Sequence, residues 1–261
     1  MNINDQVNRE IGIHGQKWNE MHEGYFSSPL VAHPLVETIT KYLLGLPADV
    51  LVDLGGGTGF ILLELIAKGI TTNIIPINLD CSETQLEAME KSGIFCVNRS
   101  ISDFKRHDLS PLDKSIFFIM RSVLHYFGKD GLIPILRHIR NQARQKEIFI
   151  HQTACFKNAE EARCINFLYK EMHTQKWYPT IAELHDSMTT TDWQIMETFP
   201  ALPLKLTSAE LGLRYGLDLQ SLENICSRVN ARFGEIENVF QLTSNGFVAH
   251  LCYNICVSKA V

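Results

Sequence analysis

A short apolar run that ends in a glycine-rich turn constrains this fold more than any other segment. The run is Val50-Leu51-Val52-Asp53-Leu54, and Gly55-Gly56-Gly57-Thr58-Gly59 follows it. A run that is apolar almost throughout is typical of a parallel strand covered on both faces. Apolar residues over 62–66 then predict a helix. A strand, a glycine turn and a helix in this order predict an open α/β sheet, whose ligand lies at the carboxyl ends of the strands.

The rest of the chain continues to alternate between strands and helices. We expect strands near residues 73–80, 94–97, 115–120 and 147–151. We expect helices over 34–45, from Ser82, around 132–139, over 158–174 and 180–189, after Thr207 and around 219–229. Two late strands, near 193–199 and 247–257, are expected to be antiparallel to each other. Alternation of this kind predicts a mostly parallel sheet with helices on its faces.

The spacing of the glycines separates the classes of ligand. Dinucleotide-binding turns read GxGxxG, and phosphate-binding loops end in Gly-Lys-Ser/Thr. Here Gly55, Gly57 and Gly59 read GxGxG, and Phe60 stands where a final glycine would be. Glycines let the backbone turn sharply and let a ligand come close. The turn therefore favours a ligand without phosphates.

Residues 53–59 resemble the first motif of the class I S-adenosylmethionine-dependent methyltransferases. The resemblance implies that S-adenosylmethionine is the cofactor and that its methionine part packs on the glycine turn. It also implies that Asp80 accepts hydrogen bonds from both ribose hydroxyls and that Asp103 accepts one from the adenine amino group. The interval from Asp53 to Asp80 is somewhat longer than usual. The expected cofactor-binding residues are Asp53, Gly55, Gly57, Gly59, Asp80, Ser102, Asp103, Phe104 and Arg121.

The same resemblance implies a fold. It is an α/β, Rossmann-like, seven-stranded and mostly parallel sheet with helices on both faces, a reversed last strand and a helical cap or lid. Residues 1–46 are expected to form the N-terminal helical cap. Residues 47–261 are expected to form the methyltransferase domain, with a helical insertion at about 157–192 and further helices at about 207–233.

A second stretch, residues 117–127, resembles the strand and loop of O-methyltransferases that act on small aromatic and related hydroxyl compounds. In several of those enzymes the histidine that matches His125 is the general base, a role that suits imidazole near neutral pH. Tyr126 departs from the acidic neighbour usual there, and the chain before the first motif is too short for that family's N-terminal dimerisation domain. The alternative for His125 is a residue that only lines the pocket.

Four residues are expected to contact the methyl acceptor: Tyr25, Phe26, His151 and Trp177. Ordinary packing is the alternative for each of them. His250, Cys252, Asn254 and Cys256 alternate along the last predicted strand. A metal site would need ligands from other elements as well, so we expect no metal.

Composition narrows the class of function. The net charge is −5 and no basic block occurs, so nothing indicates a nucleic-acid partner. Seven cysteines at irregular spacings fit a reducing compartment, and no apolar run is long enough to span a bilayer. We therefore expect a cytoplasmic protein. The resemblances above imply that it is an enzyme of secondary metabolism that methylates a small molecule, with oxygen slightly favoured over nitrogen or carbon.

Three alternatives stay open at this stage. An enzyme of the same fold can bind S-adenosylmethionine and catalyse a reaction without methyl transfer. The chain can also be a methyltransferase of macromolecules or a non-catalytic binding subunit. The sequence does not identify the acceptor or the oligomeric state.

Overall fold

The computed structural model describes residues 21–87, 89, 92–110 and 114–261. Its main sheet has seven strands in the order β3-β2-β1-β4-β5-β10-β6. These are β1 (Val50–Leu54), β2 (Ile75–Asp80), β3 (Phe95–Asn98), β4 (Ile116–Arg121), β5 (Ile148–Ala154), β6 (Trp193–Pro200) and β10 (Tyr253–Ala260). The strand β10 is antiparallel to both of its neighbours, β5 and β6, and the other pairings in the sheet are parallel. The predicted fold class, a mostly parallel sheet with one reversed strand, is confirmed.

Helices cover both faces of this sheet. On one face, α2 (Pro29–Gly45) and α3 (Phe60–Ala67) share a core cluster with β1, β4 and β5. On the other face, α6 (Gly128–Gln142) and α8 (Ile181–Thr190) share a second cluster with the same strands. In α6 the buried residues recur at helical spacing, which gives the helix one apolar stripe toward the sheet. Two short helices, α4 (Glu83–Glu87) and α5 (Arg106–Leu109), complete this half of the molecule.

One expected helix begins earlier in the structure, and another, found where expected, packs on the main sheet. α2 begins at Pro29, where the Ser28 hydroxyl caps the helix, and Pro34 lies inside it. The rule that places proline in the first turn therefore put the start too late. α8 falls within the segment expected as an insertion, yet it packs on β6 and α6 as part of the layer over the sheet.

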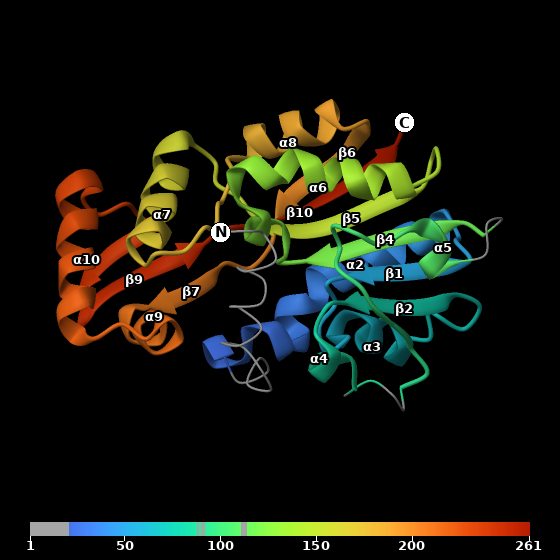
Figure 1. Ribbon diagram of the computed structural model, residues 1–261, viewed down its shortest axis with the longest axis horizontal. Helices are drawn as coiled ribbons and strands as arrows, with labels where there is room; N and C mark the ends of the chain where they lie inside the picture. The colour runs from blue at the N-terminus through green and yellow to red at the C-terminus, as the bar shows by residue number, and fades with distance from the viewer. Residues whose placement is uncertain (1–20, 88, 90–91, 111–113) are drawn as a thin grey trace.

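A smaller lobe stands at one end of the molecule (Figure 1). It contains an antiparallel sheet of order β7-β9-β8, made of β7 (Leu204–Thr207), β9 (Gly246–Leu251) and β8 (Phe240–Thr243). Three helices, α7 (Ala159–Glu171), α9 (Ser208–Tyr215) and α10 (Leu219–Phe233), share its core. The single strand expected over 247–257 is therefore wrong. It is two strands that meet at Cys252 and belong to different sheets, a change of partner that the apolar pattern does not reveal.

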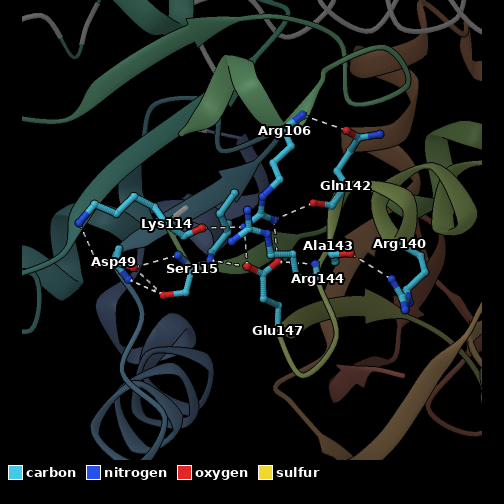
Figure 2. A network of polar contacts seen from close by, with 10 residues as sticks. Asp49, Arg106, Lys114, Ser115, Arg140, Gln142, Ala143, Arg144 and Glu147 are labelled. Carbon is cyan, nitrogen blue, oxygen red and sulfur yellow. Dashed lines mark hydrogen bonds and ion pairs between the residues drawn. The ribbon is translucent and has the colours of Figure 1, made fainter. Parts of the chain in front are cut away.

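A polar network ties the amino ends of β1, β4 and β5 together, at the edge opposite the glycine turn (Figure 2). Arg106 pairs with the buried Glu147 at 2.6 Å. Glu147 also accepts from the backbone N–H of Ile116 at 2.8 Å. Beside this pair, Asp49 accepts from the backbone and hydroxyl of Ser115. These bonds hold the amino ends of the strands together and do not involve the glycine turn.

Candidate active site

The glycine turn has the backbone that its sequence predicts. Gly55, Gly57 and Gly59 have positive φ angles of 74°, 56° and 67°, in the left-handed region where glycine carries no steric cost. The structure adds Gly56, which the GxGxG spacing does not single out. A Cβ at Gly56 would lie 2.3 Å from Asn78 Oδ1, so that position has no room for a side chain.

Hydrogen bonds hold the turn against the neighbouring strand. The Gly55 N–H donates to the Leu79 carbonyl at 2.7 Å. The Gly57 N–H donates to Asp80 Oδ2 at 2.9 Å, and Asn78 Nδ2 donates to the Gly57 carbonyl at 2.8 Å. The ends of β1 and β2 are thus joined through the turn itself. This leaves the open side of the turn facing a cavity.

The cavity encloses about 1060 Å³ of space, including its open mouth. Its wall runs across the carboxyl ends of β2, β1 and β4. The lining residues are Phe26, Asp53, Gly55, Gly56, Gly57, Thr58, Phe60, Ile61, Asp80, Cys81, Ser82, Gln85, Ser100, Ile101, Arg121, Ser122, Val123, Tyr126 and Phe127. Of the expected site residues, the structure brings Phe26, Asp53, Gly55, Gly57, Asp80 and Arg121 together here.

Two carboxylates share this wall. Asp53 is 2% exposed, and its Oδ1 has no hydrogen-bond partner in the described part of the chain. Burial raises the pKa of Asp53 to about 7, the charge of Asp80 adds to this, and Arg121 opposes it. Burial also raises the pKa of Asp80, against the N–H groups of Ser82 and Gly57 that donate to it. A cationic ligand group beside Asp53 would find a buried acceptor of opposite charge.

Arg121 joins the cavity to the 3-10 helix η2 (Met21–Ser27). Its guanidinium donates to the Phe26 carbonyl at 3.0 Å and to the Tyr25 carbonyl at 3.3 Å. It also lies over the rings of Phe26 and Phe60, at 5.4 and 5.9 Å. Burial lowers the pKa of this guanidinium. Phe26 reaches the cavity, whereas Tyr25 stacks on Tyr253 at 5.8 Å outside the lining.

The residues expected to contact the adenine of the cofactor do not lie in the cavity wall as predicted. Ser102 and Asp103 are exposed and stand outside the lining. Phe104 is fully buried in the core, edge-on to His138 at 5.2 Å, so its ring does not face the cavity. Ser100 and Ile101 take that part of the wall instead. Gly59 is also outside the lining and acts as the N-cap of α3.

His125 lies next to the cavity and not in its wall. It is on the 3-10 helix η3 (Leu124–Phe127), 5% exposed, and its ring stacks on Tyr178 at 5.2 Å. Tyr126 and Phe127, which follow it, do line the cavity. The backbone N–H of Trp177 donates to the His125 carbonyl at 3.1 Å, while the Trp177 side chain packs against the core. Trp177 is not among the lining residues.

His151 is placed away from the cavity. It is fully buried, contacts Phe149 on the α6 and α8 side of the sheet, and its Nδ1 lies 2.8 Å from Thr153 Oγ1. Burial, with a smaller effect of His185, lowers its pKa to about 3. Because side chains alternate along a strand, Gln152 takes the other face. The expectation that His151 reaches the rim is therefore not met by the structure.

The described residues contain no cluster suited to a metal ion and no helix suited to a bilayer. No three His, Cys, Asp or Glu side chains gather there in a way that could hold a metal ion. No helix in that part of the chain has the length and apolar character needed to cross a bilayer.

No family model and no curated protein matches this chain. Solved structures do match it. A SAM-dependent methyltransferase from Thermotoga maritima has a TM-score of 0.52 and 15% identity, covering 96% of this chain and 99% of its own. Geranyl diphosphate methyltransferase, solved with GPP and sinefungin, has a TM-score of 0.53 and 13% identity, covering 88% and 77%. The [4+2]-cyclase SpnF has a TM-score of 0.53 and 11% identity, covering 88% and 81%.

At these identities the likeness shows the fold alone. The chain has the class I fold of the S-adenosylmethionine-dependent methyltransferases. The likeness leaves the activity and the acceptor open.

Proposed function

We propose that this protein binds S-adenosylmethionine in the cavity and transfers its methyl group to a small molecule. The observation that carries the proposal is the meeting of Asp53, Asp80 and Arg121 around the glycine turn in one cavity. The buried Asp53 Oδ1 suits the α-ammonium of the cofactor, and Arg121 suits its carboxylate. Asp80 suits the ribose hydroxyls, because each carboxylate oxygen has a second lone pair beyond the N–H it already accepts.

The residues of the wall would act mainly by binding and orientation. The bound cofactor supplies an electrophilic methyl group on a sulfonium. Displacement at that methyl depends on holding the nucleophile in line and close. Phe26, Phe60 and Phe127 would keep water from the reacting atoms. We also propose that the N-terminal segment 1–46 caps the site, with η2 held there through Arg121; residues 1–20 lie outside the described part of the chain.

For the acceptor atom we propose oxygen, with His125 as the general base. The support is the resemblance of residues 117–127 to the loop of small-molecule O-methyltransferases and the position of His125 beside Tyr126. His125 is not among the lining residues and its ring contacts that of Tyr126, which is, so the acceptor would have to reach past Tyr126. A His125→Ala variant that kept cofactor affinity and lost turnover would support this role; unchanged turnover would exclude it.

The test of the central proposal is calorimetric titration with S-adenosylmethionine and S-adenosylhomocysteine. We expect micromolar binding by the parent and a loss of at least roughly tenfold in Asp80→Ala, equal to about 1.4 kcal/mol. The matched control is Asp218→Ala, which removes a helix-capping aspartate on α10, in the smaller lobe. Absence of binding by the folded parent would refute the proposal.

A second candidate keeps the cofactor and changes the reaction. The [4+2]-cyclase among the structural neighbours shows that the fold also serves reactions without methyl transfer. Turnover separates the two candidates, because only a methyltransferase releases S-adenosylhomocysteine in step with product.

A further inference from the structure

Ser122 has an unusual backbone conformation, and it lies in the wall of the cavity. It directly follows β4, lines the cavity, and has a φ of 62°, in the left-handed region that residues with a Cβ rarely adopt. Its N–H still donates to the Gln152 carbonyl at 2.8 Å, so the β4–β5 pairing holds it there. Such conformations cost free energy and concentrate at functional sites. The result is a hydroxyl-bearing side chain at the cavity wall.

The partner of that hydroxyl comes from the far end of the chain. Tyr253 begins β10, is 2% exposed, and its hydroxyl lies 2.5 Å from Ser122 Oγ. Burial raises the pKa of Tyr253 to about 12, although Ser122 and Arg121 both lower it. The phenol is therefore neutral at physiological pH. It is suited to donate a hydrogen bond and not to act as a base.

The order of the strands indicates what faces this pair. Asp80 ends β2, the glycine turn follows β1, and Ser122 follows β4, in that order across the sheet. The sulfur of S-adenosylmethionine lies between its ribose and its methionine part, so a cofactor with its ribose at Asp80 and its methionine part along the turn has its sulfur over the turn. The methyl group, the third substituent of that sulfur, is then available to face the end of β4, where Ser122 lines the cavity. The wall there includes Ser122, Val123, Tyr126 and Phe127, and the hydroxyl of Ser122 is hydrogen-bonded to a second buried hydroxyl.

We propose that Ser122 Oγ accepts a hydrogen bond from the nucleophilic O–H or N–H of the methyl acceptor, and that Tyr253 is the positioning residue that orients Ser122 by donating to it. The inference rests on the proposed function. In the transfer step the bond from the acceptor atom to the methyl carbon forms while the carbon–sulfur bond breaks. Sulfur keeps the electron pair. The methylated acceptor atom then carries the extra proton, breaks its hydrogen bond to Ser122 and releases that proton to solvent or to the general base proposed above.

Sinefungin tests this without knowledge of the acceptor. It carries an amine-bearing carbon where S-adenosylmethionine has the methyl-bearing sulfur, so its amine reports on groups beside the transferred methyl. S-adenosylhomocysteine has a sulfur there with neither a methyl group nor an amine on it. The measurement is the ratio of the two dissociation constants, by calorimetry, for the parent, Ser122→Ala and Tyr253→Phe. The matched control is Tyr42→Phe, which removes another buried phenol on α2.

We expect Ser122→Ala and Tyr253→Phe each to weaken sinefungin roughly tenfold relative to S-adenosylhomocysteine, the usual size of one hydrogen bond to a charged group. Tyr42→Phe should leave the ratio unchanged. Ser122→Gly should also lose the preference for sinefungin over S-adenosylhomocysteine. Its melting temperature should be no lower than that of the parent, because glycine relieves the φ of 62°. That variant separates loss of the hydroxyl from loss of folding.

Three results would overturn the inference. The first is a ratio that stays within about twofold in both variants, and the second is a parent that binds S-adenosylhomocysteine but no sinefungin. In either case the proposed function survives and this inference fails alone. A folded parent that binds neither compound removes the proposed function and the inference with it.

Discussion

Asp53 and Asp80 lie near the carboxyl ends of adjacent strands, and both carboxylates line one cavity. Burial is the main reason that the pKa of Asp53 rises to about 7, and the negative charge of Asp80 is the next. The pair therefore holds a carboxyl group that is close to half protonated near neutral pH. A charged ligand bound beside the pair would change the protonation state of Asp53.

The first prediction concerns the pH dependence of cofactor binding. S-adenosylmethionine is cationic at its sulfonium and its α-ammonium, so it favours ionised Asp53. Below pH 7 that ionisation costs free energy, and above pH 7 the carboxylate is already present. We expect affinity to rise from pH 6 to pH 8, by up to about tenfold per unit below the pKa. Calorimetry at three pH values checks this, and Asp53→Asn should flatten the profile. A flat profile in the parent would contradict it.

The second prediction concerns the crowded glycine of the turn. Gly56→Ala should abolish cofactor binding, because its Cβ would stand 2.3 Å from Asn78 Oδ1 and 2.7 Å from the carboxyl of Asp53. Gly45→Ala is the matched control, since nothing lies within 4 Å of a Cβ there. Affinity for S-adenosylhomocysteine and the melting temperature are measured for both. Normal binding by Gly56→Ala would show that the turn can shift to admit a side chain.

The third prediction concerns the network opposite the cavity. Glu147→Ala removes one partner of a buried pair and leaves Arg106 without its carboxylate. We expect a loss of about 3–5 kcal/mol in the free energy of unfolding by urea. Lys41→Ala breaks the exposed Lys41–Glu197 pair and should cost less than about 1 kcal/mol. Equal losses in the free energy of unfolding would mean that the buried pair contributes no more to stability than the exposed pair.

The fourth prediction concerns His151 and stability in acid. Its folded-state pKa of about 3 lies below the unfolded value of about 6.5, so the unfolded chain takes up the proton first. Above pH 6.5 this residue has no effect. Below it, the free energy of unfolding should fall by about 1.4 kcal/mol per pH unit, down to the folded pKa.

Urea unfolding at pH 7.5, 6 and 5 measures this slope. His151→Gln should reduce the slope, and His107→Gln, which changes an exposed ring, should leave it as in the parent. A slope that is unaltered by His151→Gln would assign the acid sensitivity to other groups.

The parallel strands and the glycine turn are the part of this fold that could be predicted from the sequence. Both depend on local signals, since the apolar run of β1 and the glycines after it specify one strand end and one backbone shape. The place of Asp80 follows from the same logic, because parallel strands end at one edge of the sheet.

Prediction from the local sequence failed for side chains whose surroundings are formed by distant parts of the chain. Phe104 was expected beside the cofactor because it follows Asp103, yet its ring is taken up by the core under α6. His151 was expected at the rim because it lies near the end of a strand, yet alternation turns it to the other face. The Ser122–Tyr253 contact joins residues 131 positions apart, and no pattern within either segment predicts it.

The place of β10 has a consequence for how the protein is made. This strand lies between β5 and β6, so β6 joins the main sheet only through it. A ribosome produces β10 well after β6, and until then β6 has no partner in that sheet. Tyr253 is the first residue of the same strand. A nascent chain therefore exposes the unpaired edge of β5 from the end of that strand until β10 is made. The contact between Tyr253 and Ser122 beside the cavity forms only then, and an unpaired strand edge of this kind makes a folding intermediate prone to aggregation.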